Sequence, residues 1–148
     1  FDGLVALSGS IAHGRSILGA QALGADFAYI GSPWIAASEA NADEGYKKAI
    51  VDSSAEGIVY TNLFTGVHGN YLRSSIEASG LDPDDLPARA MINVSEDINP
   101  DKRPKRWRDI WSAGHSVAGV HDIPNVGKLI DRVAVEYETA EGATGEPT

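Results

Sequence analysis

Two pairs of small residues near the start of the chain have the types and spacing that suit the binding of a phosphate group. One apolar run leads into Gly9 and Ser10, and a second leads into Gly31 and Ser32. The backbone N–H groups at the start of a helix have no intrahelical partner, and the helix dipole favours an anion there. Glycine leaves the backbone open to such a ligand because it has no side chain. The pattern indicates a phosphate site built from backbone amides, although the same residues could also simply form two tight turns.

The elements that must position these pairs are two short strands, each followed by a helix. Residues 4–7 and 27–30 are continuous apolar runs, as in strands that are buried on both faces of a parallel sheet. The first run precedes a helical pattern that Gly24 ends. The second precedes a short helix, with Ser32 expected as its cap and Pro33 in its first position. This alternation predicts an α/β fold in which both strands end at the same edge of a parallel sheet.

The rest of the chain divides into a body, a terminal helix and a tail. Within the body, residues 1–123, we expect a helix capped by Ser38, an extended segment that feeds a helix over residues 71–78, and an irregular excursion over residues 80–105. Apolar residues then recur at helical spacing, which predicts an amphipathic helix over residues 124–140. The composition of residues 141–148 is typical of a flexible tail.

The composition excludes several classes of function. The 148 residues are 43% hydrophobic, which is typical of a globular protein. Their formal net charge of −9 is unfavourable for binding nucleic acid. The sequence has no cysteine, which removes disulfides, thiolate metal sites and cysteine nucleophiles and fits a cytoplasmic protein. No apolar run approaches the ~18 residues of a membrane span. The chain starts inside an apolar strand, so we expect it to begin within a longer protein.

Several segments, in order, resemble the nitronate monooxygenase family, formerly called 2-nitropropane dioxygenases. The likeness reaches about Ala140 and so covers nearly the whole chain. The segments with the clearest likeness are SGSIAHGR at residues 8–15, ALGAD at 22–26, YIGS at 29–32, EA at 39–40, YK at 46–47, FTG at 64–66, YLR at 71–73, GLDP at 80–83, residues 107–111, SAG at 112–114 and the terminal helix through EY at 136–137.

The resemblance implies that the chain is the C-terminal portion of a (β/α)8 TIM barrel that binds FMN. The flavin phosphate would lie on Gly9 and Ser10 after one strand and on Gly31 and Ser32 after the next. The family often has a second glycine where this chain has Ser10, whose hydroxyl could add a hydrogen bond to the phosphate. The reaction implied is FMN-dependent oxidation of alkyl nitronates by O₂, with the N-terminal half of the barrel, or another chain, completing the enzyme.

The resemblance assigns no catalytic residue to this chain. The histidine that acts as the base in members of the family that use nitroalkanes comes from an earlier strand, upstream of Phe1, so the chain alone is expected to be inactive. His115, where the family usually has glutamine, and Ser116 are expected to border the substrate pocket. Two alternatives stay open: an FMN-dependent enoyl reductase of the same barrel superfamily, and a non-catalytic phosphate-binding or assembly module.

Other residues with chemical potential are expected to have structural or surface roles. His13 and Arg15 lie beside the expected phosphate site and could contact it, but loop histidines and first-turn arginines more often face solvent. We expect His68 to occupy a turn and His121 to be structural. The three tryptophans are expected to be core anchors. The acidic pairs at 84–85 and 96–97 have no histidine at ligand spacing, so we expect them to be solvated and predict no metal site.

Overall fold

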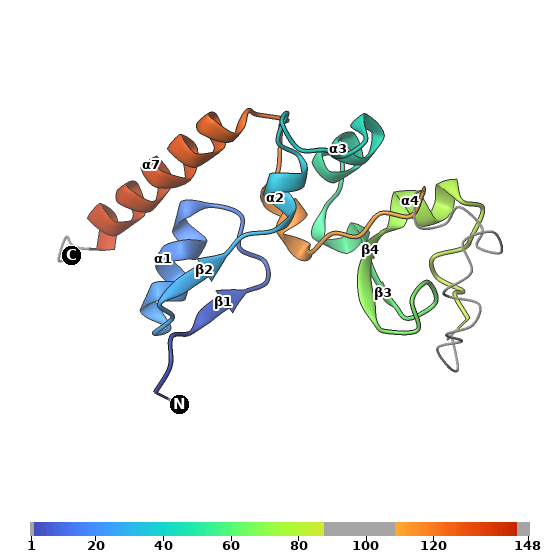
Figure 1. Ribbon diagram of the computed structural model, residues 1–148, viewed down its shortest axis with the longest axis horizontal. Coiled ribbons are helices and arrows are strands. Elements are labelled where there is room, and N and C mark those ends of the chain that lie inside the picture. Colours follow the sequence, from blue (N-terminus) through green and yellow to red (C-terminus); the bar gives the residue numbers. More distant parts are fainter. Residues whose placement is uncertain (1, 88–108, 145–148) are drawn as a thin grey trace.

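The computed structural model describes residues 2–87 and 109–144, which form an arch with a small sheet at each end (Figure 1). The N-terminal sheet lies beside two helices at one end of the arch, and the second sheet lies at the other end. The short helices α2 and α3 lie between them. Residues 88–105 of the predicted excursion, including the acidic pair at 96–97, lie outside the described residues, as does Trp107.

The N-terminal sheet is the predicted βαβ unit. The strands β1 (Ala6–Ser8) and β2 (Phe27–Tyr29) are parallel, and they are joined by the helix α1 (Gly14–Ala22). Gly24 ends this helix as predicted: its φ is +88°, and its N–H donates to the carbonyl of Gln21 at 2.9 Å.

The prediction that these strands are buried on both faces is wrong for the described chain. Ser8 pairs with Tyr29 and Ala6 pairs with Phe27, so these four side chains share one face of the sheet, and all four are exposed. The opposite face, which contains Leu7 and Ala28, is half-buried, and α1 packs close to β2. The helix that joins the two strands can cover only one face of the sheet. The apolar side chains on the other face are therefore left uncovered by the described residues.

Two predicted helix caps are wrong. The helix α2 (Ser32–Ile35) begins after Gly31, and the hydroxyl of Ser32 accepts a hydrogen bond from Gly114 instead of capping the helix. The helix α3 (Glu44–Val51) is capped by Asp43, whose carboxylate accepts the N–H of Gly45 at 2.8 Å. A carboxylate is a charged acceptor and interacts favourably with the helix dipole, and Ser38 lies too far upstream to reach this terminus.

A β-hairpin, which the sequence analysis did not foresee, follows the single turn η1 (Ala55–Gly57). Its strands β3 (Ile58–Thr61) and β4 (Gly69–Leu72) are antiparallel, and the helix α4 (Arg73–Ala78) follows directly. The expected extended segment feeding a helix is thus confirmed in outline. Tyr71, expected in the helix, is in the strand because it pairs with Val59 and forms a bridge to Ser112.

The larger hydrophobic core cluster is formed mainly by residues of α2 and α3 and of the segment that precedes α7, and not by the N-terminal sheet. The turn η3 (His115–Gly119) contributes to it, and a smaller cluster of Tyr71, Ile76 and Ile110 lies under the hairpin. The buried members of the larger cluster are Ala36, Ile50, Leu72, Ala113, Val117 and Val120.

The terminal helix α7 (Val126–Thr144) confirms the predicted amphipathic helix and extends it. We expected a helix over residues 124–140 and a tail over 141–148, but the helix begins two residues later and continues to Thr144. Residues 145–148 lie outside the described chain. The helix packs against α1, and its apolar residues Leu129 and Ala140 are buried. Among the described helices, none has the length and apolar character needed to span a membrane.

Candidate functional site

The two pairs of small residues lie at one edge of the N-terminal sheet. Ser8, the last residue of β1, is opposite Tyr29, the last residue of β2, so the two parallel strands end level with each other. Gly9 and Ser10 follow one strand end, and Gly31 and Ser32 follow the other after one intervening residue. We refer to these four residues as the rim. The predicted juxtaposition of the two strand ends is therefore present.

The first half of the rim has an unusual backbone conformation. Gly9 has a φ of +101° and Ser10 a φ of +56°, and Ser10 is the one non-glycine residue with positive φ among the described residues. A side chain in this left-handed region costs about 1–2 kcal/mol relative to glycine. This cost gives a physical reason for the glycine that the resemblance places at the position of Ser10. Strain of this kind often occurs where a backbone holds a ligand.

The rim leaves hydrogen-bond donors and open space at the strand ends. A Cβ added at Gly9 or at Gly31 would meet no atom within 4 Å. Within residues 2–87 and 109–144, no acceptor receives a hydrogen bond from the N–H of Ser10. The donors and the open space fit an anionic group such as the phosphate of FMN.

Ser32 connects the rim to the segment predicted to border a substrate pocket. Its side chain is buried, and its Oγ accepts the N–H of Gly114 at 3.0 Å. The hydroxyl proton of Ser32 is thus left to donate to another group. Ser116 is also buried, and its Oγ and that of Ser32 each lie 3.7 Å from a Cβ built on Gly114. Ser116 therefore lies beside the rim, whereas His115 is exposed.

The segment that contains Gly114 is held in place by an aromatic pair. Tyr46 and Trp111 stack with ring centroids 5.3 Å apart, and the hydroxyl of Tyr46 donates to the carbonyl of Ser112. Burial raises the pKa of Tyr46 above its usual value, so its hydroxyl stays protonated and able to donate. Trp111 thus acts as the expected structural anchor.

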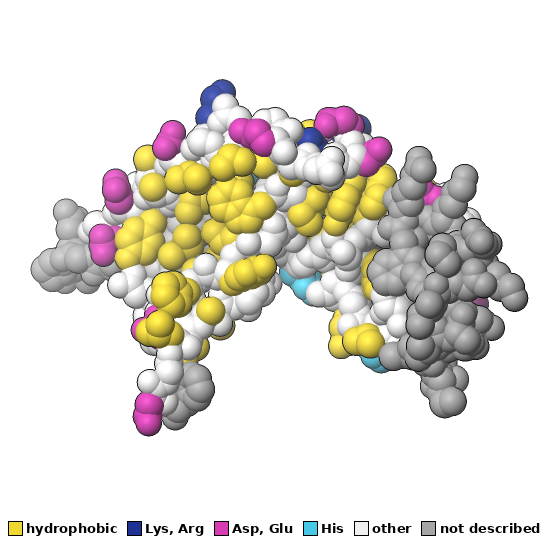
Figure 2. Space-filling model, in the orientation of Figure 1, with side chains coloured by type: hydrophobic (Ala, Val, Ile, Leu, Met, Phe, Trp, Pro, Cys, Tyr) yellow, Lys and Arg dark blue, Asp and Glu magenta, His cyan; other side chains and the backbone are white. Residues whose placement is uncertain are grey.

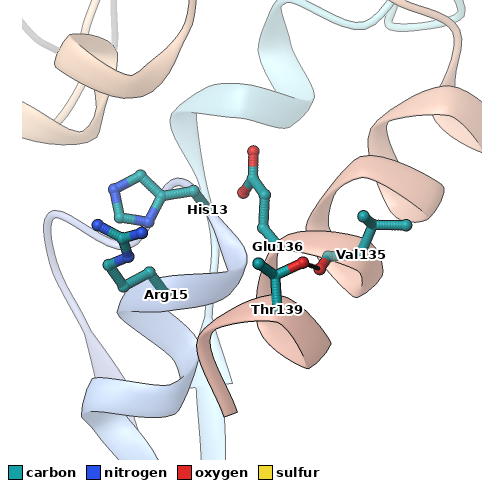
Figure 3. A pocket seen from close by; sticks show the side chains of 5 residues that line it. All are labelled: His13, Arg15, Val135, Glu136 and Thr139. Carbon is teal, nitrogen blue, oxygen red and sulfur yellow. Dashed lines mark hydrogen bonds between the residues drawn. The ribbon is translucent and has the colours of Figure 1, made fainter. Parts of the chain in front are cut away.

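His13 and Arg15 line a cleft of about 330 Å³ between the start of α1 and the helix α7 (Figure 3). Val135, Glu136 and Thr139 form the α7 side of this cleft. The Nδ1 of His13 accepts the N–H of Ser16 at 3.1 Å, so His13 is the N-cap of α1. Its imidazole thus has a structural role in the helix in addition to facing this exposed cleft.

The sequence analysis assigned no role to Glu136. Its Oε2 accepts the N–H of Gly14 in the first turn of α1 at 2.9 Å. The two residues are 122 positions apart, and Glu136 is one of several glutamates near the end of the chain. No local pattern in the sequence distinguishes it from its neighbours.

The remaining candidates lie away from the rim or in structural contacts. His68 stacks on Tyr60 with ring centroids 4.9 Å apart. Asp84 forms a two-point ion pair with Arg73, and hydrogen bonding to that guanidinium lowers the pKa of the carboxyl group. Asp122, the neighbour of His121 in the sequence, forms an ion pair with Arg132 on α7. In the described part of the chain, no three potential ligands among His, Asp and Glu are grouped as for a metal ion.

Curated proteins with similar sequences are nitronate monooxygenases. The chain is 34% identical over 79 residues to a nitronate monooxygenase from Paraburkholderia phytofirmans, which covers 53% of this chain and 22% of that protein. It is 26% identical over 113 residues to a probable nitronate monooxygenase from Staphylococcus saprophyticus, and the match covers 73% of this chain and 32% of that protein. It is 21% identical over 140 residues to a probable nitronate monooxygenase from Staphylococcus haemolyticus, with 91% of this chain and 39% of that protein covered. The chain thus spans well under half the length of these relatives. No protein-family model matches it.

Solved structures show the same fold. A nitroalkane oxidase from Streptomyces ansochromogenes superposes with a TM-score of 0.75 at 23% identity, over 97% of this chain and 42% of that enzyme. A FabK variant from Thermotoga maritima superposes with a TM-score of 0.73 at 21% identity, over 97% of this chain and 45% of the other. These relatives and structural neighbours are oxidoreductases. The curated relatives, at low identity and over part of their length, support the assignment of this chain to the nitronate monooxygenase family.

Proposed function

We propose that this chain supplies the FMN phosphate-binding, C-terminal portion of a TIM-barrel enzyme that oxidises alkyl nitronates with O₂. The observation that supports this most directly is the rim: two parallel strands end level, and each is followed by small residues before a helix. The structural neighbours are TIM-barrel enzymes, and this chain covers less than half of each. Barrels of this type commonly hold phosphate on the loops after two adjacent strands.

The residues present fit a mononucleotide's phosphate. The N–H group of Ser10 and the hydroxyl of Ser32 would donate to the phosphate oxygens, and Gly9 and Gly31 would let the backbone approach the group closely. No lysine or arginine is needed, because amides at strand and helix ends bind anions by their partial charges. When bound, FMN would supply the redox chemistry by taking electrons from the nitronate and passing them to O₂. Ser116, beside the rim, is proposed to border the substrate pocket with His115.

The rest of the enzyme would come from the N-terminal half of the barrel or from another chain. The bare face of the N-terminal sheet, with exposed Phe27 and Tyr29, requires such a cover. The base that removes a proton from a nitroalkane is proposed to come from that half, so this chain contributes binding and orientation. A cytoplasmic location, which the lack of cysteine fits, is part of the same proposal.

A second candidate is an FMN-dependent enoyl reductase. The observation that favours it is the superposition on FabK, an enoyl reductase, with nearly the same TM-score as on the nitroalkane oxidase. Both candidate enzymes would bind the FMN phosphate in the same way, so the geometry of the rim does not distinguish between the two functions. The similarity of sequence to nitronate monooxygenases favours the first.

The substitution Gly31→Ala tests the phosphate site. Gly31 has a φ of −116°, which alanine can adopt, and the added Cβ would meet no protein atom within 4 Å. We expect the free energy of unfolding to change by less than about 0.5 kcal/mol. FMN binding should weaken by about tenfold, while riboflavin, which lacks the phosphate, should bind as before. The control Gly142→Ala adds a methyl group in similarly open space on α7 and should alter neither affinity.

The activity is tested on the complete enzyme, with the N-terminal half of the barrel supplied. Nitronate-dependent O₂ uptake would support the first candidate, and NADH-dependent reduction of an enoyl substrate would support the second. Flavin absorbance without either turnover would support a non-catalytic binding or assembly module. FMN binding that is no tighter than riboflavin binding, and is unaffected by Gly31→Ala, would contradict the phosphate site itself.

A further inference from the structure

A carboxylate on α7 anchors the helix that follows the first half of the rim. Glu136 Oε2 accepts the N–H of Gly14 at 2.9 Å, and Gly14 lies only four residues beyond Ser10 along the chain. The first turn of α1 contains no acidic residue of its own. Glu136 thus supplies, from the other end of the chain, the negative charge that a helix N-terminus favours.

The two helices approach each other closely at this point. A Cβ on Gly14 would lie 2.1 Å from the backbone N of Tyr137 and 2.3 Å from the carbonyl oxygen of Val133. The absence of a side chain at Gly14 therefore brings its N–H within reach of the Glu136 side chain. The start of α1 is fixed to α7 both by this packing and by the hydrogen bond.

The loop between β1 and α1 is thus held at its two ends. At one end, Ser8 is paired with Tyr29 in the sheet. At the other end, Ser16 Oγ accepts the N–H groups of Ala12 and His13, at 3.3 and 3.2 Å, and Glu136 holds Gly14. Between these anchors, the left-handed backbone at Gly9 and Ser10 is unfavourable for serine and depends on the fixed ends.

We infer that Glu136 is a positioning residue for the rim. By accepting the Gly14 N–H, it holds the loop in the conformation that directs the N–H group of Ser10 toward a phosphate. It touches neither cofactor nor substrate in this role. The consequence for FMN rests on the proposed function, whereas the anchoring of the loop does not. Figure 3 shows Glu136 on α7, facing the start of α1 across the cleft.

The test compares Glu136→Leu, which removes the acceptor, with Glu136→Gln, whose amide oxygen can still accept the hydrogen bond. The matched control is Glu138→Leu, because Glu138 is an exposed glutamate of α7 with no hydrogen bond to the described residues. Amide hydrogen exchange of residues 9–14 measures the anchoring in the full chain. Dissociation constants for FMN and riboflavin, from flavin fluorescence, measure the consequence.

We expect Glu136→Leu to raise the exchange rate of the Gly14 amide and to weaken FMN binding, each by about tenfold, since one hydrogen bond to a charged acceptor is lost. Riboflavin binding should be unchanged. Glu136→Gln keeps the acceptor but loses the charge, so its exchange rate and FMN affinity should lie between those of the wild type and of Glu136→Leu. Glu138→Leu should match the wild type. Because Glu136→Gln preserves the shape of the side chain, it also gives a result if the leucine variant folds poorly.

Unchanged exchange in Glu136→Leu would overturn the inference, as would faster exchange with undiminished FMN affinity. A glutamine variant as weak as the leucine variant would overturn the role of the hydrogen bond, and equal losses for FMN and riboflavin would overturn the link to the phosphate. If the wild type binds no FMN, the proposed function fails, while the exchange rates still decide whether Glu136 holds the loop.

Discussion

At the scale of single residues, backbone conformation and close approach decide which amino acids the candidate site accepts. Ser10 and Gly14 lie four positions apart and illustrate the two constraints. Ser10 has a side chain in a left-handed conformation, where glycine is favoured. Gly14 has an ordinary helical conformation but no room for a side chain. The sequence does not distinguish these two situations, because both positions simply contain a small residue.

Ser10→Gly should stabilise the folded chain. It removes a left-handed serine, which costs about 1–2 kcal/mol, and adds the conformational entropy of a glycine, which costs about 0.5–1 kcal/mol, so a net gain of up to about 1.5 kcal/mol is expected. Urea unfolding measures the difference. The control Ser74→Gly, at an exposed position of the helix α4, should destabilise the chain by about 0.5 kcal/mol. A loss of stability in Ser10→Gly similar to that in the control would contradict the argument.

Gly14→Ala should destabilise the chain by about 3 kcal/mol, because the new methyl group meets backbone atoms of α7 that cannot rotate away. Gly19→Ala is the matched control: it lies in the same helix, is exposed, and has no atom within 4 Å of the added Cβ. That change should stabilise the chain by up to about 1 kcal/mol, since alanine favours the helix. Thermal or urea unfolding of the two variants should therefore shift in opposite directions, and equal shifts would refute the close approach.

At the scale of elements, α7 connects parts of the chain that are distant in sequence. Both carboxylate oxygens of Glu39 accept the N–H of Val126, at 3.1 and 3.0 Å, and the N–H of Ser38 donates to the carbonyl of Pro124. The segment after α2 thus caps the start of α7, and Glu136, further along α7, caps the start of α1. One helix therefore restrains the chain after both strand ends of the rim.

The cap at Glu39 predicts a loss of stability in acid. The hydrogen bond from Ser38 and that from Val126 lower the pKa of Glu39 below 4.5. A carboxyl group with a lowered pKa in the folded state stabilises that state above its unfolded pKa, and the stabilisation is lost as the pH falls through the folded pKa. The melting temperature of Glu39→Gln should thus lie below that of the wild type at about pH 6, and the gap should narrow as the pH falls below about 4.5.

Thermal unfolding at a series of pH values measures this gap. Asp84 and Asp122 also have lowered pKa values, each mainly through a hydrogen bond to an arginine, so the wild type alone does not isolate Glu39. The control Glu138→Gln removes an exposed carboxylate of α7 that forms no hydrogen bond with the described residues, and its stability should parallel that of the wild type at every pH. A gap between Glu39→Gln and the wild type that is independent of pH would contradict the cap as its cause.

At the scale of the whole molecule, the arch exposes apolar side chains at the end that contains the rim. Phe27 and Tyr29, which are 58% and 66% exposed, lie on one face of the two-stranded sheet, and Leu4, which precedes β1, is 72% exposed. Figure 2 shows hydrophobic side chains gathered over this end of the molecule. Exposed strand edges and apolar faces of this kind pair with other chains when they are left uncovered.

The 148-residue chain by itself should therefore self-associate with increasing concentration. The substitution Tyr29→Lys should shift the chain toward monomer, because a charge on this face opposes burial. Leu23→Lys is the control, since Leu23 is 81% exposed but follows α1, away from the bare face. Sedimentation velocity measures the distribution. A chain that remains monomeric at high concentration, or equal effects of the two substitutions, would contradict the prediction.

The sequence by itself determined the βαβ unit, the position of the rim and the terminal helix. Each depends on local signals: short apolar runs for β1 and β2, a glycine that ends α1, and a helical period in α7. The family likeness came from the same local motifs, because segments such as SGSIAHGR contain both the strand end and the start of the helix.

The tertiary structure alone decided which partners these elements find. Ser32 forms a hydrogen bond with Gly114 instead of capping its own helix, and Glu136 caps a helix 122 positions away. The hairpin formed by β3 and β4 was missed for the same reason, since Tyr71 is in a strand through its pairing with Val59 and Ser112. Such contacts depend on how distant elements pack, and neither the residue types nor their spacing encode that packing locally.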